Sequence, residues 1–294
     1  MIIMAKVKID WHTKEAKHLN KDIVLDRFHR HLKSSGLHSS TIELYLARLN
    51  AFLEYADCED PSVETANEYR DALIDRDISK SHINNTCFAI KRFYKLNNIE
   101  WKFIVLREDE RVPYYFDEND VLAIFSVCTN IKHLAILQTL FYGCLRSSEL
   151  CRLEDKDLDL KAKTIRLRQT KNGHDSVTMI NGDCVETLRR YLRVRPQQEI
   201  DGKIPLFYTD YLHLWSKEDI HRMFMDYKKK AGIKKPGAVH VFSRHTTATM
   251  MIANGADIRI VQEILRHRDI RTTLRYAHVS DKTKREKYEQ CLTL

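Results

Sequence analysis

Residues 265–279, LRHRDIRTTLRYAHV, combine one tyrosine with four arginines and two histidines. A tyrosine taken at random is most often a core or rim residue whose hydroxyl is hydrogen-bonded. A phenol oxygen is also a nucleophile, which a nearby base and surrounding cations can activate. Tyr276 therefore has two interpretations, a residue of a basic helix end or a reactive group, and the rest of the chain must decide between them.

Three other stretches carry cationic residues placed at the ends of expected elements. GCLRSSEL (143–150) has Arg146 after a helix stop and at the start of the next helix, and HVFSRHTTAT (240–249) has Arg244 at the start of a helix. Lys171 lies beside a hairpin turn at Asn172-Gly173. Arginine suits phosphate because its planar fork gives two parallel hydrogen bonds and keeps its charge. Each residue alone is more often structural, but the ordered set indicates a common site.

The elements of the first third are predicted to be helices. In SSTIELYLARLNAFLEYA, apolar residues recur at helical spacing on one face, and Ser40 with Glu43 is typical of a capping box. In SHINNTCFAIKRFYKL, four residues are expected to point inward: Ile83, Cys87, Ile90 and Phe93. The opposite face carries Lys91, Arg92 and Lys95. Such a face is usually only solvated, but it could also lie along a phosphate backbone.

The rest of the chain is predicted to be mixed. A charged stretch with Pro113 reads as a linker before a helix at DENDVLAIFSVC, and an apolar helix at 131–142 ends at Gly143. The alternation in TIRLRQTKNGHDSVTMI predicts a β-hairpin over 164–180. Further helices are expected at 183–194, 216–231, 242–254 and 257–266.

Composition excludes several classes of protein. No segment approaches the roughly 18 apolar residues that span a bilayer, and the N-terminus has no signal-peptide pattern, so a cytoplasmic protein is expected. The seven cysteines are scattered and never spaced as CxxC, so neither a disulfide framework nor a structural zinc site is expected. Residues 221–294 hold 16 lysines and arginines against seven acidic residues, whereas residues 1–220 hold 33 against 34. This local basic excess favours a polyanionic partner.

The ordered set of motifs resembles the tyrosine recombinase, or lambda-integrase-like, family over nearly the whole chain. The most specific matches are GCLRSSEL and the nine-residue spacing between His267 and Tyr276. The resemblance implies a mainly α-helical, Xer-like architecture: a helical, SAM-like core-binding domain and an α+β catalytic domain with a small antiparallel sheet. The corresponding boundaries are an extension at 1–20, the core-binding domain at 21–106, a linker at 107–116 and the catalytic domain with its C-terminal tail at 117–294.

The resemblance also implies a role for each residue of the site. Arg146 and Arg244 would hold the non-bridging oxygens of a scissile DNA phosphate, and Tyr276 would attack the phosphorus and hold the 3′ end. Lys171 would protonate the departing 5′ oxygen, and His267 would hydrogen-bond the phosphate. No cofactor and no metal ion is required.

One departure from the family pattern concerns the remaining histidine, which usually stands three residues before the second arginine. That position is Val241, and His240 lies four before Arg244. Either His240 still reaches the phosphate, which we favour since i and i+4 share a helix face, or the histidine role is weakened or lost. His245 is predicted to be a packing residue or to act only through a neighbour.

Two other residues receive expectations from their positions. Arg266 replaces a residue that is often glycine in the family, and it would either add a phosphate contact or be solvated. Glu149 is expected to orient its helix rather than to take part in chemistry.

The resemblance predicts a site-specific recombinase that cuts and rejoins double-stranded DNA through a 3′-phosphotyrosine. It would act as a homo-tetramer on two duplexes, as a Xer-like recombinase or a mobile-element integrase, with the C-terminal tail packing on a neighbouring protomer. Two alternatives stay open: a type IB topoisomerase-like relaxing enzyme, and a recombinase-derived DNA-binding protein with an impaired site. A metal-dependent nuclease is disfavoured because the sequence lacks a carboxylate cluster with ligand spacing.

Overall fold

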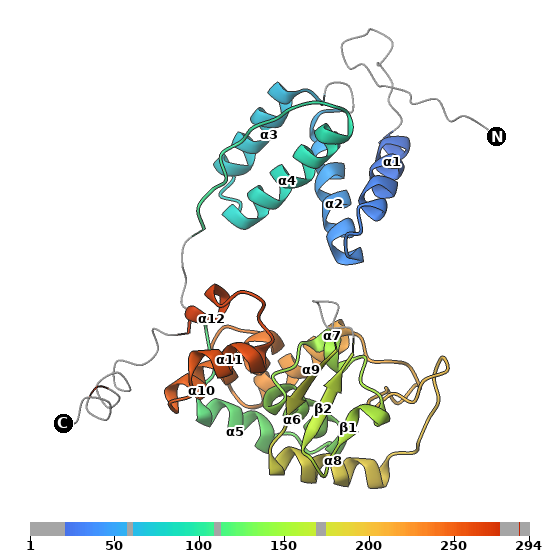
Figure 1. Cartoon of the computed structure of the whole chain (residues 1–294), viewed down its shortest axis with the longest axis vertical. Coiled ribbons are helices and arrows are strands. Elements are labelled where there is room, and N and C mark those ends of the chain that lie inside the picture. Colours follow the sequence, from blue (N-terminus) through green and yellow to red (C-terminus); the bar gives the residue numbers. More distant parts are fainter. Residues whose placement is uncertain (1–20, 58–60, 109–112, 169–174, 277–287, 289–294) are drawn as a thin grey trace. The chain divides into compact units, whose positions relative to one another are not determined.

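The computed structural model describes residues 21–57, 61–108, 113–168, 175–276 and 288. The chain divides into two compact units, Met1–Glu110 and Arg111–Leu294, which are considered separately below (Figure 1). Among the residues that the structure describes, no helix is long and apolar enough to cross a membrane.

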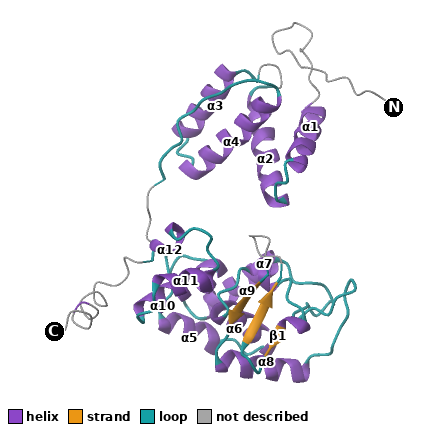
Figure 2. Ribbon diagram, in the orientation of Figure 1, coloured by secondary structure: helices purple, strands orange, loops and turns teal. Residues whose placement is uncertain are grey.

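The described part of the first unit is built from helices joined by short turns, without strands (Figure 2). Its helices are α1 (Lys21–Ser34), α2 (Ser39–Tyr55), α3 (Val63–Asp75) and α4 (Lys80–Leu96). Helices α2 and α4 pack on each other, and α1 packs against α2. All four residues predicted to face inward on α4 are buried: Ile83, Cys87, Ile90 and Phe93.

The start of α2 differs from the sequence prediction. The N-cap is His38, whose imidazole accepts a hydrogen bond from the backbone N–H of Ser40. The helix therefore begins one residue before Ser40, and the predicted capping box of Ser40 with Glu43 is wrong. A histidine ring can cap a helix because one nitrogen of neutral imidazole is an acceptor, but histidine is outside the residues usually expected there.

The second unit is mostly helical and contains one small sheet. Its helices are α5 (Glu118–Ser126), α6 (Ile131–Tyr142), α7 (Ser147–Leu150), α8 (Gly182–Val194), α9 (Lys217–Lys230), α10 (Thr247–Ala253), α11 (Ile258–Leu265) and α12 (Arg271–Leu274). A 3₁₀ turn spans Asp155–Asp157, and a π-helix, Val241–Thr246, leads directly into α10.

The sheet is antiparallel, with strand order β1 (Leu158–Asp159), β2 (Thr164–Leu167) and β3 (Ser176–Met179). Thr164 pairs with Met179 and Leu167 with Ser176. The strands of the predicted hairpin are therefore confirmed, while its Asn172-Gly173 turn and Lys171 lie outside the described residues. The predicted fold class, mainly helical with a small antiparallel sheet, is confirmed.

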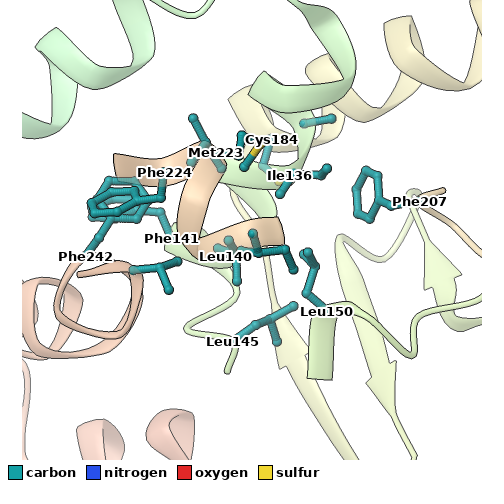
Figure 3. Packing of buried hydrophobic residues seen from close by; sticks show 14 of the residues in the cluster. Ile136, Leu140, Phe141, Leu145, Leu150, Cys184, Phe207, Met223, Phe224 and Phe242 are labelled. Atoms are coloured by element: carbon teal, nitrogen blue, oxygen red, sulfur yellow. The ribbon is translucent and has the colours of Figure 1, made fainter. Parts of the chain in front are cut away.

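The main core of the second unit anchors the segments that carry the candidate site (Figure 3). Leu145 and Phe242 are fully buried in it, and they stand one and two residues before Arg146 and Arg244. Phe242 packs against Phe224 of α9 with ring centroids 5.1 Å apart. Removal of such a buried aromatic side chain typically costs about 3–5 kcal/mol. The backbone around both arginines is thus fixed by well-packed neighbours.

A smaller apolar cluster buries the tyrosine of the opening motif. Tyr276 packs with four other buried residues, Cys144, Ala248, Val261 and Leu265. The cluster joins the α6–α7 turn, α10 and α11 to the residue that follows α12. It therefore gathers the sequence motifs, which are far apart along the chain, around one place.

Candidate active site

Arg146 is fixed by its own helix start. It is the N-cap residue of α7, and its backbone N–H donates to Glu149 Oε2 at 2.8 Å. Its guanidinium Nη1 donates to the other oxygen of the same carboxylate at 2.7 Å. The Arg146 side chain retains 25% of its exposure, whereas that of Glu149 retains 3%. Glu149 thus holds Arg146 in place, while the exposed part of the Arg146 side chain remains accessible to an anion from solvent.

Arg244 is the most deeply buried cation of the site, with 2% of the residue exposed. Its Nη1 donates to the carbonyl of Cys144 at 2.8 Å, and its Nη2 donates to the carbonyl of Leu265. Burial, followed by the charge of Arg146, lowers the pKa of Arg244 to about 10. The guanidinium is still charged at neutral pH, and the two carbonyls fix its plane.

Arg266 adds a third guanidinium. It ends α11 in the left-handed conformation, with φ at 55°. Its Nη2 donates to the carbonyl of Cys144 at 2.8 Å and to Glu149 Oε2 at 3.0 Å. Only 6% of its side chain is exposed, so the alternative in which Arg266 is simply solvated is wrong.

Glu149 is the carboxylate between these cations. Burial alone would raise its pKa, but the charge of Arg266 and the contacts with Arg146 outweigh burial and lower it. Glu149 therefore stays ionised at neutral pH and orients Arg146 and the start of α7. The expected orienting role of Glu149 is confirmed.

The π-helix accounts for the position of His240. A π-turn closes hydrogen bonds to i+5 and so contains one residue more than an α-turn. The segment that separates His240 from Arg244 also contains one residue more than the family pattern, and it lies in the π-helix. The charges of Arg244 and Arg146 both act on the His240 imidazole. His240 thus remains beside the two arginines despite the offset.

His267 is oriented by α11 and α12. Its Nδ1 and Thr273 Oγ1 are 2.8 Å apart, and its carbonyl accepts a hydrogen bond from the Gln262 side chain at 3.0 Å. Thr273 is fully buried. The Thr273 contact orients the imidazole and the Gln262 contact holds the backbone of His267, and the charges of Arg244 and Arg146 act on the ring.

The three histidines of the site are uncharged at neutral pH. Burial, together with smaller contributions from nearby charges that include Arg244, lowers the pKa of His240, His245 and His267 to about 4 each. A neutral imidazole offers one hydrogen-bond donor and one acceptor. The site therefore combines fixed cations with uncharged groups that are able to accept a proton.

The Tyr276 hydroxyl lies among these groups. The residue is 2% exposed, and its oxygen is 2.5 Å from His245 Nδ1. Burial raises the pKa of Tyr276, against the lowering effect of Arg244 and Arg275. The phenol is therefore protonated at neutral pH, and any reaction in which it is the nucleophile needs an acceptor for its proton.

Five of the six predicted site residues belong to this one constellation: Arg146, His240, Arg244, His267 and Tyr276. The sixth, Lys171, lies outside the described residues. Sequence reasoning missed the contact of His245 with Tyr276 and the burial of Arg266. Neither left a signal in the sequence, because the first contact joins residues 31 positions apart and the second depends on a carboxylate 117 positions away.

Comparison with known proteins agrees with this geometry. Residues 114–283 match the model of the phage integrase family, which is more than half of the chain. The chain is 28% identical over 283 residues to tyrosine recombinase XerA of Pyrococcus horikoshii, covering 94% of this chain and 96% of that protein. It is 26% identical over 260 residues to tyrosine recombinase XerA of Saccharolobus solfataricus, covering 83% and 84% of the two chains.

Two solved structures have a fold similar to that of this chain. A crystal structure of XerA recombinase is 27% identical, with a TM-score of 0.55 and coverage of 93% of this chain and 99% of that one. The Tn1549 transposon integrase in complex with circular intermediate DNA is 23% identical, with a TM-score of 0.71 and coverage of 91% and 99%, and shows the fold alone.

The chain therefore belongs to the phage integrase family, and its enzyme class is that of the tyrosine recombinases. The family resemblance of the motifs is confirmed.

Proposed function

We propose that the chain is a site-specific DNA recombinase that cuts and rejoins strands through a covalent 3′-phosphotyrosine, either as a Xer-like recombinase or as the integrase of a mobile element. The observation that carries this proposal is the Tyr276 hydroxyl held against a neutral imidazole within the electrostatic reach of Arg244. That arrangement places a potential nucleophile next to a fixed cation.

The proposed chemistry assigns the phosphate to the two arginines. Arg146 and Arg244 bind the non-bridging oxygens and stabilise the charge that develops in the transition state. His240 and His267 supply hydrogen bonds to the same oxygens. Tyr276 forms the bond to phosphorus while the bond to the 5′ oxygen breaks, and Lys171 gives that oxygen its proton. The phosphotyrosine conserves the energy of the broken bond, so rejoining needs no other energy source.

The test begins with selection of a substrate. The protein is incubated in excess EDTA with a pool of DNA duplexes that have a randomised central segment, and adducts that survive denaturation are isolated and sequenced. A selected duplex should then give an adduct with the wild-type protein, while Tyr276→Phe still binds the duplex without forming an adduct. An adduct with Tyr276→Phe would refute the assignment of the nucleophile.

The polarity of the linkage is tested on the same duplex. If the linkage is a 3′-phosphotyrosine, the fragment upstream of the cut stays bound to the protein, so a label at the 5′ end of the cleaved strand remains in the adduct. The downstream fragment is released with a free 5′ hydroxyl. A label placed at the 3′ end should leave with the released fragment. The opposite distribution of the two labels would contradict the proposed mechanism.

We assign DNA binding also to the first unit as the core-binding domain, with residues 107–116 as the linker to a catalytic domain. The support is a basic surface on α1 and α4. The pKa of His31 is lowered by burial and then by the charges of Arg92, Arg27 and Lys95. A cluster of cations at this density suits a phosphate backbone.

The proposed tetramer on two duplexes is supported by an apolar pocket in the second unit. Its volume is about 450 Å³, and its lining includes Phe141, Met250 and Met251. The end of the chain, CLTL, is apolar and lies outside the described residues. We assign this pocket to the tail of a neighbouring protomer. A chain that ends at Ser280 should bind one duplex normally but lose the assembly of two duplexes, and unchanged assembly would refute the tail exchange.

The two alternative functions make different predictions. A topoisomerase-like enzyme would relax any supercoiled plasmid as a monomer, without sequence preference. A DNA-binding protein with an impaired site would form no adduct on any selected duplex. The offset of His240 is the sequence feature that favours impairment. The charges of Arg244 and Arg146, which act on His240 in the structure, favour the recombinase instead.

A further inference from the structure

The closest polar partner of the Tyr276 hydroxyl is His245, a residue to which the proposed reaction gives no role. His245 Nδ1 and Tyr276 Oη are 2.5 Å apart, and the two rings lie 5.7 Å apart at an angle of 49°. The contact joins a nitrogen to the nucleophilic atom itself and lies at the short end of hydrogen-bond reach, about 2.6–3.2 Å, which proton transfer requires.

The π-helix places His240 and His245 on the same face. Residues five apart share a face of a π-helix, as residues three or four apart do in an α-helix. His240 and His245 are five apart, and their rings meet edge to face with centroids 4.8 Å apart. His240 therefore packs on the His245 ring and restrains its rotation, with the Nδ1 edge toward Tyr276.

The charged and titratable groups around His245 come from several elements. Arg244 and His240 belong to its own helical segment, and Arg275 follows α12, and each of these lowers the pKa of His245 in addition to burial. Tyr276 lies against its Nδ1. His267, between α11 and α12, completes the set, because the charge of His245 acts on it in turn. The imidazole is uncharged in these surroundings, and in the tautomer that carries its hydrogen on Nε2 the Nδ1 atom is an acceptor.

We propose that His245 accepts the phenolic proton of Tyr276 as the tyrosine attacks the scissile phosphate. The inference rests on the proposed function. As the Oη–phosphorus bond forms and the bond from phosphorus to the 5′ oxygen breaks, the proton moves from Oη to His245 Nδ1. The 5′ oxygen takes its own proton from a separate acid. In rejoining, the 5′ hydroxyl attacks, Tyr276 leaves, and His245 returns the proton.

The first arm of the test needs no DNA. Nitrogen-15 NMR of the full-length protein should show His245 with its hydrogen on Nε2 at neutral pH and with Nδ1 as an acceptor. Tyr276→Phe should shift the Nδ1 resonance. A hydrogen on Nδ1 at neutral pH would overturn the proposal, because Tyr276 would then be the acceptor of this hydrogen bond.

The second arm measures single-turnover adduct formation on the selected duplex. In His245→Asn, the side-chain oxygen can still accept a hydrogen bond near the former Nδ1 position but cannot take the proton. Adduct formation should fall about 10²–10⁴-fold, with unchanged DNA binding, and should then rise steadily with pH as hydroxide replaces the base. A rate within threefold of wild type, or a faster rate, would overturn the proposal.

A matched control is another partly buried histidine–tyrosine pair among the described residues of this unit. His133 Nδ1 and Tyr227 Oη are 3.0 Å apart, on α6 and α9. His133→Asn makes the same chemical change in a similar contact outside the site, so its adduct rate should equal that of the wild type. An equal fall in the rate of adduct formation in His133→Asn and His245→Asn would mean that both substitutions act through folding. This outcome would also overturn the proposal.

A modified substrate separates the two proton transfers. When sulfur replaces the bridging 5′ oxygen, the leaving group needs no proton, so Lys171→Ala should recover its rate while His245→Asn stays slow. Recovery of His245→Asn would make His245 part of leaving-group protonation and would refute the inference. Failure of the proposed function itself would look different, since the wild-type protein would then form no adduct.

Discussion

Replacement of Glu149 by glutamine tests how the site holds its cations. The carboxylate accepts three hydrogen bonds, from the Arg146 backbone, the Arg146 guanidinium and Arg266. A glutamine oxygen in the place of Oε2 keeps two of them, but its amide group then faces Arg146 Nη1, donor against donor. One charge-assisted bond, worth about 1.5–3 kcal/mol, is lost. Because the buried Arg266 also loses its counter-charge, the total should reach about 3–5 kcal/mol.

The free energy of unfolding is measured by urea denaturation at pH 7 and at pH 4. The pKa of Glu149 is lowered in the folded protein, so its ionisation stabilises the fold above the ordinary value of 4.5. This contribution is lost as the pH falls through the lower folded pKa. The difference between wild type and Glu149→Gln should therefore be full at pH 7 and smaller at pH 4.

The exposed Glu186 of α8 provides the control. Glu186→Gln should change stability by no more than about 0.5 kcal/mol. If Glu149→Gln cost less than about 1 kcal/mol at pH 7, or if its cost did not shrink in acid, the carboxylate would not be the group that holds the arginines.

Two further changes test other parts of the structure. Arg266→Gly removes the strain of a non-glycine residue in the left-handed conformation, worth about 1 kcal/mol, but it also removes the hydrogen bonds to Cys144 and Glu149. Urea denaturation should therefore show a net decrease of about 2 kcal/mol in the free energy of unfolding. A more stable variant would contradict this account. Replacement of Lys91 and Lys95 by alanine should reduce the slope of log K for DNA binding against log salt concentration by about one to two. The control Lys102→Ala should leave this slope unchanged. An unchanged slope in the double variant would exclude α4 from the DNA interface.

The sequence predicted the parts of the site that depend on local order. The spacing between His267 and Tyr276 follows from consecutive elements, α11 and α12, and Arg146 follows from a helix stop and a helix start. Gly143 marks the end of α6 in the sequence and in the structure. Signals of this kind lie within a few residues of each other, so a pattern along the chain is sufficient to find them.

The parts that sequence did not predict depend on long-range contacts or on backbone irregularity. The π-helix has no pattern of its own, and without it His245 looks like a packing residue next to Arg244. The burial of Arg266 depends on Glu149, which belongs to a different motif.

The carbonyl oxygen of Cys144 accepts hydrogen bonds from both Arg244 and Arg266. Two cations from distant parts of the chain are thus tied to one main-chain atom, in a turn where Cys144 has φ at 50°. Because the shared acceptor is backbone, a change of side chain at this position does not remove it. An opening of this turn would remove one hydrogen bond from each guanidinium group in a single event, while Arg244 would keep its bond to the Leu265 carbonyl and Arg266 its bond to Glu149. Local unfolding of the turn would therefore loosen both arginines together, and neither would be loosened alone.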